Sequence, residues 1–384
     1  MAYYRKTKSG KWEVIVYLGI NPSNGKNKYQ SKRFKLKKDA KVWAREKEND
    51  KGMGIVIDSS DYNIKEYLEW LLTDIKPGLS PTTYDGYKSI INSHLIPALG
   101  AIKLDKLKPM HIKKYITKKR INGRIDGKKG GLSERTILHH FRLLNKALKT
   151  AVKLQLIKYN PAKAIDAPKP KKTKIKYLNK EELKELLKIA KSTNKWMYFF
   201  VKFTSYTGMR RGEVLGLSWS DVELQNKIIR VQQTLVKKVG EGSIIKKNPK
   251  TASSKRSITI ENDIIKILKT ILKSQNENKL LLGPKYNNNH NLVFCKENGE
   301  KYYPSTVSRN FNKILQKTSL DPKLNIHSLR HTHATLLLKA KVNPKIVQER
   351  LGHASITETL DTYSHVIPTM QKETAKKFEK LMNI

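Results

Sequence analysis

The sequence contains a single cysteine, Cys295, among 384 residues. One thiol allows no internal disulfide and no zinc site built from cysteines. No apolar run approaches the roughly 20 residues that span a bilayer, so no contact with a membrane is expected. The first residues, Met-Ala-Tyr-Tyr-Arg, also lack the apolar core of a secretory signal. We therefore expect a soluble protein of the cytoplasm.

Acidic side chains are scarce. Only 33 Asp and Glu oppose 78 Lys and Arg, which gives a formal net charge of +45. Self-repulsion of this size disfavours an ordinary metabolic enzyme and indicates a polyanionic partner. Because 38% of the residues are hydrophobic, a folded core is still expected. The positive charge is spread over every part of the chain, which favours contact with DNA or RNA along most of its length and an association with the nucleoid.

Residues 1–57 predict a small sheet backed by a helix. Apolar and polar side chains alternate from Trp12 onward, with Val14 and Val16 on one side and Glu13 on the other. The strands carry many Lys and Arg, so we interpret this part as a β-sheet reader of DNA. A β-domain for protein contacts is the alternative. Strands are expected at residues 3–6, 12–18 and 29–36, and a helix at 37–50.

Residues 58–166 predict an all-α module of about four helices. The apolar side chains from Ile64 to Leu72 recur at helical spacing. Pro81 and Pro109 each stand at the expected first position of a helix. The next stretch, 167–176, contains two prolines and five lysines, which is typical of an extended linker. Two basic domains joined in this way would suit a clamp that closes around a duplex.

Residues 177–384 predict a mixed α+β domain. Three strands are expected at 227–235, 243–248 and 256–260, arranged as a β-meander, and helices dominate after Pro304. The predicted fold class is therefore multidomain, mainly α with small β.

Three clusters in this last part carry candidate chemistry. The first is Thr-Gly-Met-Arg-Arg-Gly-Glu around Arg210, where glycine allows close approach to a phosphate near a helix start. The second places His327 and Arg330 three apart, on one face of a helix. The third is Leu-Gly-His at His353, followed ten residues later by Tyr363. Each cluster is weak evidence by itself.

The second cluster also has one feature of a metal site. His327 and His331 have the i, i+4 spacing of zinc ligands in metalloproteases. That chemistry also needs a glutamate beside the first histidine, and Ser328 stands there instead. No metal is therefore expected.

Taken together and in this order, the three clusters resemble the tyrosine recombinase (phage integrase) family. The helical module resembles the core-binding domain of that family. The N-terminal sheet resembles the arm-binding domain of integrases from phages and conjugative transposons. The resemblance implies a site-specific recombinase of a mobile element, which cuts and rejoins DNA to integrate and excise that element.

The resemblance also implies a role for each residue. Two arginines would bind the scissile phosphate, and two histidines would donate hydrogen bonds to it or shuttle a proton. The tyrosine would attack to form a 3′-phosphotyrosyl bond, and a lysine on a β-hairpin turn would protonate the leaving 5′-hydroxyl. Lys246, Lys247 and Lys255 are close rivals for that lysine. The six assigned residues are Arg210, Lys250, His327, Arg330, His353 and Tyr363.

The implied partner is double-stranded DNA, at core-type and arm-type sites. Neither ATP nor a metal is expected, because the covalent bond stores the energy needed for rejoining. A homotetramer on DNA, a directionality factor and a host DNA-bending protein are further expected partners, in a bacterial host. The C-terminal segment, 370–382, would pack on its own domain or on a neighbouring protomer. A type IB topoisomerase-like enzyme and a non-catalytic architectural DNA-binding protein are the alternative functions.

Overall fold

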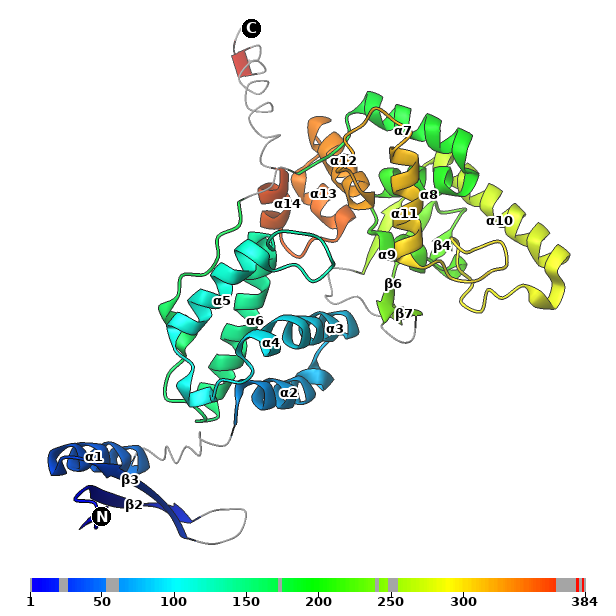
Figure 1. Ribbon diagram of the computed structural model, residues 1–384. Coiled ribbons are helices and arrows are strands. Elements are labelled where there is room, and N and C mark those ends of the chain that lie inside the picture. The colour runs from blue at the N-terminus through cyan, green and yellow to red at the C-terminus, as the bar shows by residue number, and fades with distance from the viewer. Residues whose placement is uncertain are drawn as a thin grey trace. The chain divides into compact units, whose positions relative to one another are not determined.

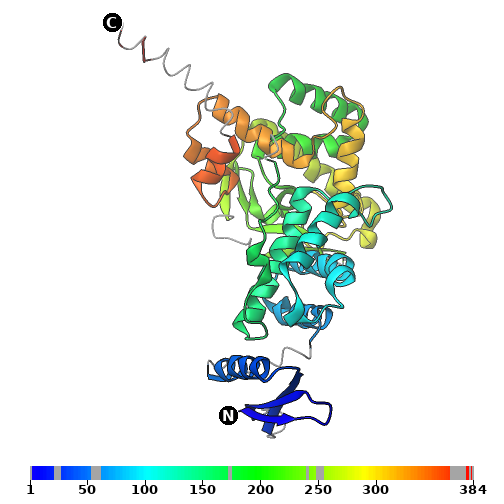
Figure 2. The ribbon, with the colours of Figure 1, turned by 60° about the vertical axis from the view of Figure 1, so that its left-hand side comes forward.

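The computed structural model describes residues 2–20, 27–52, 62–171, 175–238, 242–247 and 255–363, with residues 378, 379 and 382. The chain divides into two compact units, residues 1–172 and 173–384. Figures 1 and 2 show the ribbon from two directions. The predicted fold class is confirmed, whereas the boundaries expected for the individual domains stay predictions.

The chain begins with a three-stranded antiparallel sheet in the order β1-β2-β3, covered by helix α1 (Figure 1). Val14, Val16 and Leu18 of the middle strand are buried, together with Ala40 and Ala44 of the helix. The alternation read from the sequence is therefore confirmed. The elements are β1 (Ala2–Lys6), β2 (Trp12–Ile20), β3 (Asn27–Phe34) and α1 (Lys37–Gly52).

The helical part that follows is built from four main helices, as expected. The apolar stripe from Ile64 to Leu72 is buried in its core. Pro81 and Pro109 each open a helix, and the side chain of Ser133 caps another. The elements are α2 (Ile64–Ile75), α3 (Pro81–Ile90), α4 (Ile96–Leu99), α5 (Pro109–Asn122), α6 (Glu134–Lys153), a π-helical turn (Ile91–Leu95) and 3-10 turns at Lys76–Gly78, Leu104–Lys106 and Pro161–Ala164.

The π-helical turn was not expected from the sequence. Pro97 follows it, and a proline removes a backbone donor and crowds the carbonyl four residues earlier, which a wider turn relieves. The turn carries His94, whose ring lies 4.6 Å from that of the buried His140. His140 Nδ1 lies 2.8 Å from the Tyr115 hydroxyl. Two imidazoles are thus enclosed in the core of this module.

These histidines make the module sensitive to acid. Burial, reinforced by the charges of His94 and Lys119, lowers the pKa of His140 to about 4, and burial also lowers the pKa of His94. The folded state thus favours neutral rings. The contribution of these rings to folding stability is therefore complete above pH ~6.5 and is lost as the pH falls toward ~4. We expect a loss of up to about 3 kcal/mol over that interval.

Urea unfolding of the full chain from pH 4.5 to 7.5, with amide protection of α6 as the local readout, measures this effect. A His94→Leu variant should show a flatter pH dependence, because one titrating group is gone. His139→Gln alters an exposed histidine of α6, whose charge contributes less to the lowered pKa of His140 than that of His94 does, and is the control. If the free energy of unfolding depended on pH equally in the wild type and in His94→Leu, His94 would not contribute to the acid sensitivity.

The second unit packs helices around two small sheets (Figure 1). Its core includes Phe200, Phe203 and Phe294, whose rings meet edge to face. The helices are α7 (Lys180–Thr193), α8 (Lys195–Thr207), α9 (Arg211–Gly216), α10 (Asn262–Leu282), α11 (Pro304–Leu315), α12 (Ile326–Lys339), α13 (Pro344–Leu351) and α14 (Ile356–Tyr363), with 3-10 turns at Trp219–Asp221 and Gly283–Lys285. The strands are β4 (Val222–Glu223), β5 (Ile228–Val231), β6 (Gln233–Lys238), β7 (Gly242–Lys247) and β8 (Arg256–Thr259).

The expected β-meander is wrong. The strand predicted over 227–235 is interrupted at Gln232, and its halves join different sheets, β4-β5-β8 and β6-β7. The reason is the close packing of β6 on α9. The Gln233 side chain donates to the carbonyl of Gly216 at 2.7 Å, and a Cβ at Gly216 would lie 2.9 Å from the Leu235 nitrogen.

In the part of the chain that the structure describes, no helix has both the length and the apolar character needed to cross a membrane.

Candidate active site

The turn between α8 and α9 positions the first predicted arginine. Helix α8 ends at Gly208, whose φ of +67° is the left-handed conformation that glycine tolerates best. A Cβ there would lie 2.6 Å from Cδ2 of His333, so only glycine fits. Two residues later Arg210 occupies the N-cap of α9 with a partly exposed side chain. The Gly-Met-Arg sequence therefore aims one guanidinium outward from a tightly packed turn.

Arg330 joins this turn from α12. Its side chain is buried, and its Nη1 donates to the carbonyl of Gly208 at 2.8 Å. Arg210 in turn donates from Nη2 to the carbonyl of Gly352 at 3.2 Å. These two bonds join the first sequence cluster to the second and the third, each across more than a hundred residues of the chain. The structure thus brings both arginines and the Leu-Gly-His segment together.

His353 and His327 lie in the electrostatic field of these arginines. Burial, then the charges of Arg330 and Arg210, lowers the pKa of His353 to about 3. Loss of hydration and the same two charges lower the pKa of His327, although that residue stays accessible to solvent. Nδ1 of His353 lies 2.8 Å from the hydroxyl of Thr359 on α14. Both imidazoles are therefore neutral at pH 7.

The buried carboxylate of Glu213 binds the guanidinium of Arg210. Glu213 accepts from Arg210 Nη1 and from Arg256 Nη2, each at 2.8 Å. Burial alone would raise the pKa of Glu213, but Arg256 and Arg210 lower it to about 2, so the group is ionised. Arg256 also donates to the carbonyl of Arg350 at 2.7 Å. One anion thus orients two cations.

Comparison with known proteins shows three matches in chain order. Residues 2–51 match the Arm DNA-binding domain, and residues 63–120 match the phage integrase N-terminal SAM-like domain. Residues 176–370, about half of the chain, match the phage integrase family. This chain belongs to the phage integrase family. Members of the family are tyrosine recombinases that cleave and rejoin DNA, and this chain is an integrase of that kind.

Curated relatives match the integrase over nearly its whole length. A "Tyrosine recombinase XerC-like" protein of Caldanaerobacter subterraneus is 29% identical over 397 residues, covering 97% of each chain. The "ICEBs1 integrase" of Bacillus subtilis is 26% identical and covers 98% of this chain and 99% of its own. A solved structure of the Tn1549 transposon integrase, in complex with a circular intermediate DNA, shares the fold with a TM-score of 0.68 at 23% identity. It covers 79% of this chain and 95% of the other.

Two predicted catalytic residues of the integrase are described only in part or not at all. Lys250 lies outside the described residues, between β7 and β8. Its rivals Lys246 and Lys247 lie at the end of β7, and Lys255 immediately precedes β8. Tyr363 is the last residue of α14, one helical turn after Thr359, and its side chain is not described. Both assignments stay predictions.

Several residues that hold the site together were not predicted from the sequence. His333 is buried, with Nδ1 2.9 Å from the Ser205 carbonyl and Nε2 accepting from Arg350 at 3.0 Å. This pattern fixes a neutral ring with its proton on Nδ1, in agreement with a pKa lowered to about 3, mainly by burial. The position of Glu213 could have been predicted from the sequence, because an acid three residues after an N-cap makes a capping box. No sequence pattern marks Arg256 and Arg350, since their partners are distant in sequence.

Among the residues that the structure describes, no three His, Cys, Asp or Glu side chains are grouped so as to hold a metal ion.

Proposed function

We propose that this integrase integrates and excises its element with the six residues assigned from the sequence, through a 3′-phosphotyrosyl intermediate. The carrying observation is the pair of bonds from Arg330 to Gly208 and from Arg210 to Gly352, which assembles two guanidinium groups beside His353. A planar guanidinium can bind two phosphate oxygens at once and stays charged at any working pH. Two such groups fit a phosphodiester whose negative charge grows in the transition state.

The neutral histidines add hydrogen bonds without adding charge. When the Thr359 hydroxyl donates to Nδ1 of His353, the proton of that ring resides on Nε2 and can be donated to a phosphate oxygen. His327, which is accessible to solvent, can donate in the same way or shuttle a proton. A tyrosine hydroxyl has an ordinary pKa near 10, so the positive field at this site is what would favour its attacking anion.

The DNA partners follow from the same family assignment. We propose that the arm domain binds arm-type sites and that the second unit, with the helical module, acts on core-type sites in the cytoplasm of a bacterial host. A homotetramer on DNA is proposed by analogy with the lambda integrase tetramer solved on a Holliday junction, which shares the fold with a TM-score of 0.54. A directionality factor and a host DNA-bending protein stay predictions.

A covalent adduct tests this proposal. Protein incubated with DNA from the element ends and then denatured should migrate with the DNA, and EDTA should leave the yield unchanged. Recombination between two DNAs separates an integrase from a topoisomerase-like enzyme, which would relax supercoils without exchanging partners. Absence of any adduct would favour the architectural DNA-binding alternative.

Lys250 is proposed as the general acid for the leaving 5′-hydroxyl. Lys250→Ala should slow cleavage of ordinary DNA by roughly 10²–10⁴-fold, the range typical of general acid catalysis. A substrate with a 5′-bridging phosphorothiolate has a leaving group that needs no proton, so it should restore the rate. Lys246→Ala and Lys255→Ala are the matched controls. Rescue confined to either of these variants would move the role to that lysine.

A further inference from the structure

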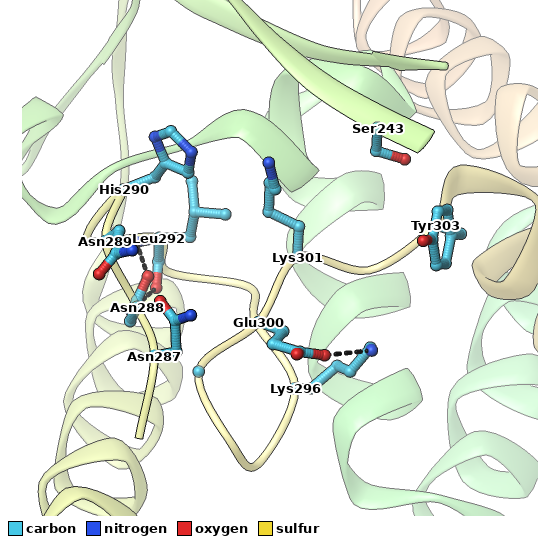
Figure 3. Close-up of a pocket in the computed structure, with 11 residues that line it drawn as sticks. Ser243, Asn287, Asn288, Asn289, His290, Leu292, Lys296, Glu300, Lys301 and Tyr303 are labelled. Carbon is cyan, nitrogen blue, oxygen red and sulfur yellow. Dashed lines mark hydrogen bonds and ion pairs between the residues drawn. The ribbon is translucent and has the colours of Figure 1, made fainter. Parts of the chain in front are cut away.

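A pocket of about 330 Å³ lies in the second unit. It is formed by the start of β7 and by the loop between α10 and α11, and Figure 3 shows its lining. Arg210, His327, Arg330 and His353 are not among the described residues that line it. The volume is at the lower end of the range for small-molecule sites and suits a ligand about the size of a nucleotide.

The charge of the lining is positive. The side chain of Lys301 makes no hydrogen bond or ion pair with another described residue, and its ammonium lies between His290 and Ser243 in the view of Figure 3. Burial, then Lys301 and Lys247, lowers the pKa of His290, which places both ammonium groups near that ring. The one acid among the described lining residues, Glu300, pairs with Lys296 at 2.7 Å. Among the described lining residues, the charge of Lys301 is therefore not balanced by an acid.

Ser243 gives an independent indication of a ligand. Its side chain is 7% exposed, and its hydroxyl has no hydrogen-bond partner among the described residues. An unsatisfied buried hydroxyl costs roughly 1–3 kcal/mol, so such a group indicates a missing partner. The neighbouring Gly242 packs against the Tyr303 ring, where an added Cβ would lie 3.4 Å away. Ser243 therefore belongs to a closely packed stretch of the pocket wall.

The rest of the lining supplies neutral donors on a fixed loop. Asn288 is a structural residue, because its amide bonds both the nitrogen and the carbonyl of Leu292. The side chains of Asn287 and Asn289 make no hydrogen bond within the described residues. Gly299 closes the loop, since a Cβ there would lie 2.8 Å from the Asn287 carbonyl carbon. The pocket thus presents ammonium, amide and hydroxyl groups from a constrained frame.

We propose that this pocket binds a phosphate group, held by Lys301 and the Ser243 hydroxyl, as a second anion site distinct from that of the scissile phosphate. A cation is disfavoured because the one acid is already paired. A phosphate offers several acceptor oxygens, which can accept hydrogen bonds from the Lys301 ammonium, the Ser243 hydroxyl and the side-chain amides of the pocket. The phosphate belongs either to a DNA strand bound by the integrase or to a free nucleotide. Binding of a DNA phosphate at this pocket rests on the proposed function, whereas binding of a free nucleotide does not depend on it.

Thermal unfolding of the full chain with AMP tests the site without any recombination. AMP should raise the melting temperature of the wild type, and Lys301→Ala and Ser243→Ala should lose most of that rise. Without ligand, Ser243→Ala should melt at the same temperature or higher, because it removes an unsatisfied hydroxyl. Lys269→Ala, which removes an exposed lysine of α10, controls for non-specific anion binding and should respond like the wild type.

The salt dependence of binding to a 30-base-pair duplex identifies the source of the phosphate. If a DNA phosphate occupies the pocket, Lys301→Ala should reduce the slope of log affinity against log salt by about 0.9, and Lys269→Ala should not. An unchanged slope with loss of the AMP effect would assign the site to free nucleotides. An unchanged slope and an unchanged AMP response in both pocket variants would overturn the proposal, even if the protein recombines DNA normally.

Discussion

Tyr363→Phe should abolish the covalent adduct while leaving DNA binding intact. The change removes one oxygen atom, so the aromatic ring is kept and only the proposed nucleophile is lost. Because the Tyr363 hydroxyl is the proposed nucleophile that attacks the scissile phosphate and expels the 5′-hydroxyl, adduct formation should fall by roughly 10⁴-fold or more without it. The readout is the yield of protein-linked DNA after denaturation, measured beside a gel shift of the native complex.

A matched control is Tyr198→Phe, a half-buried tyrosine of α8 in the same unit. It should form adduct at the level of the wild type. Equal adduct from Tyr363→Phe would move the nucleophile to another residue. Equal loss in both variants would show that the assay reports folding instead of chemistry.

Glu213→Gln should be the most destabilising single change at the site. The carboxylate is buried and bonds both Arg210 and Arg256, so removing its charge leaves two guanidinium groups without their shared anion. Breaking a buried ion pair in this way costs roughly 3–5 kcal/mol. Because Arg210 also loses the partner that orients it, cleavage should slow in the fraction that remains folded. Urea unfolding and the rate of adduct formation measure the two effects separately.

The control is Glu223→Gln, which removes an acid paired with Arg230 in a more exposed position. A pair of that kind contributes at most about 1 kcal/mol. The pH dependence gives a second readout. Since the folded pKa of Glu213 is lowered to about 2, its stabilisation is present above pH ~4.5 and is lost as the pH falls toward 2. A wild-type unfolding midpoint for Glu213→Gln would show that Arg256 and Arg210 do not depend on this anion.

Local signals were reliable where neighbours along the chain decide the outcome. Apolar alternation from Val14 to Leu18 predicted a strand, and the stripe from Ile64 to Leu72 predicted a buried helix face; both are present. Proline at the first helical position marked two helix starts correctly. These features depend on backbone geometry and side-chain period, which act over a few residues.

The sequence alone determined the basic character of the chain, its division into sheet, helical and mixed parts, and the family motifs that carry Arg210, Arg330 and His353. Only the tertiary structure decided that the strand over 227–235 breaks into two sheets, because close packing of β6 on Gly216 is a contact between distant segments. It alone revealed that Glu213 serves two arginines and that His333 is a neutral structural ring, since Arg256 and Arg350 arrive from far along the chain. Spacing in sequence fixes the direction of a side chain on its own element, whereas its partners and its pKa depend on what the fold packs against it.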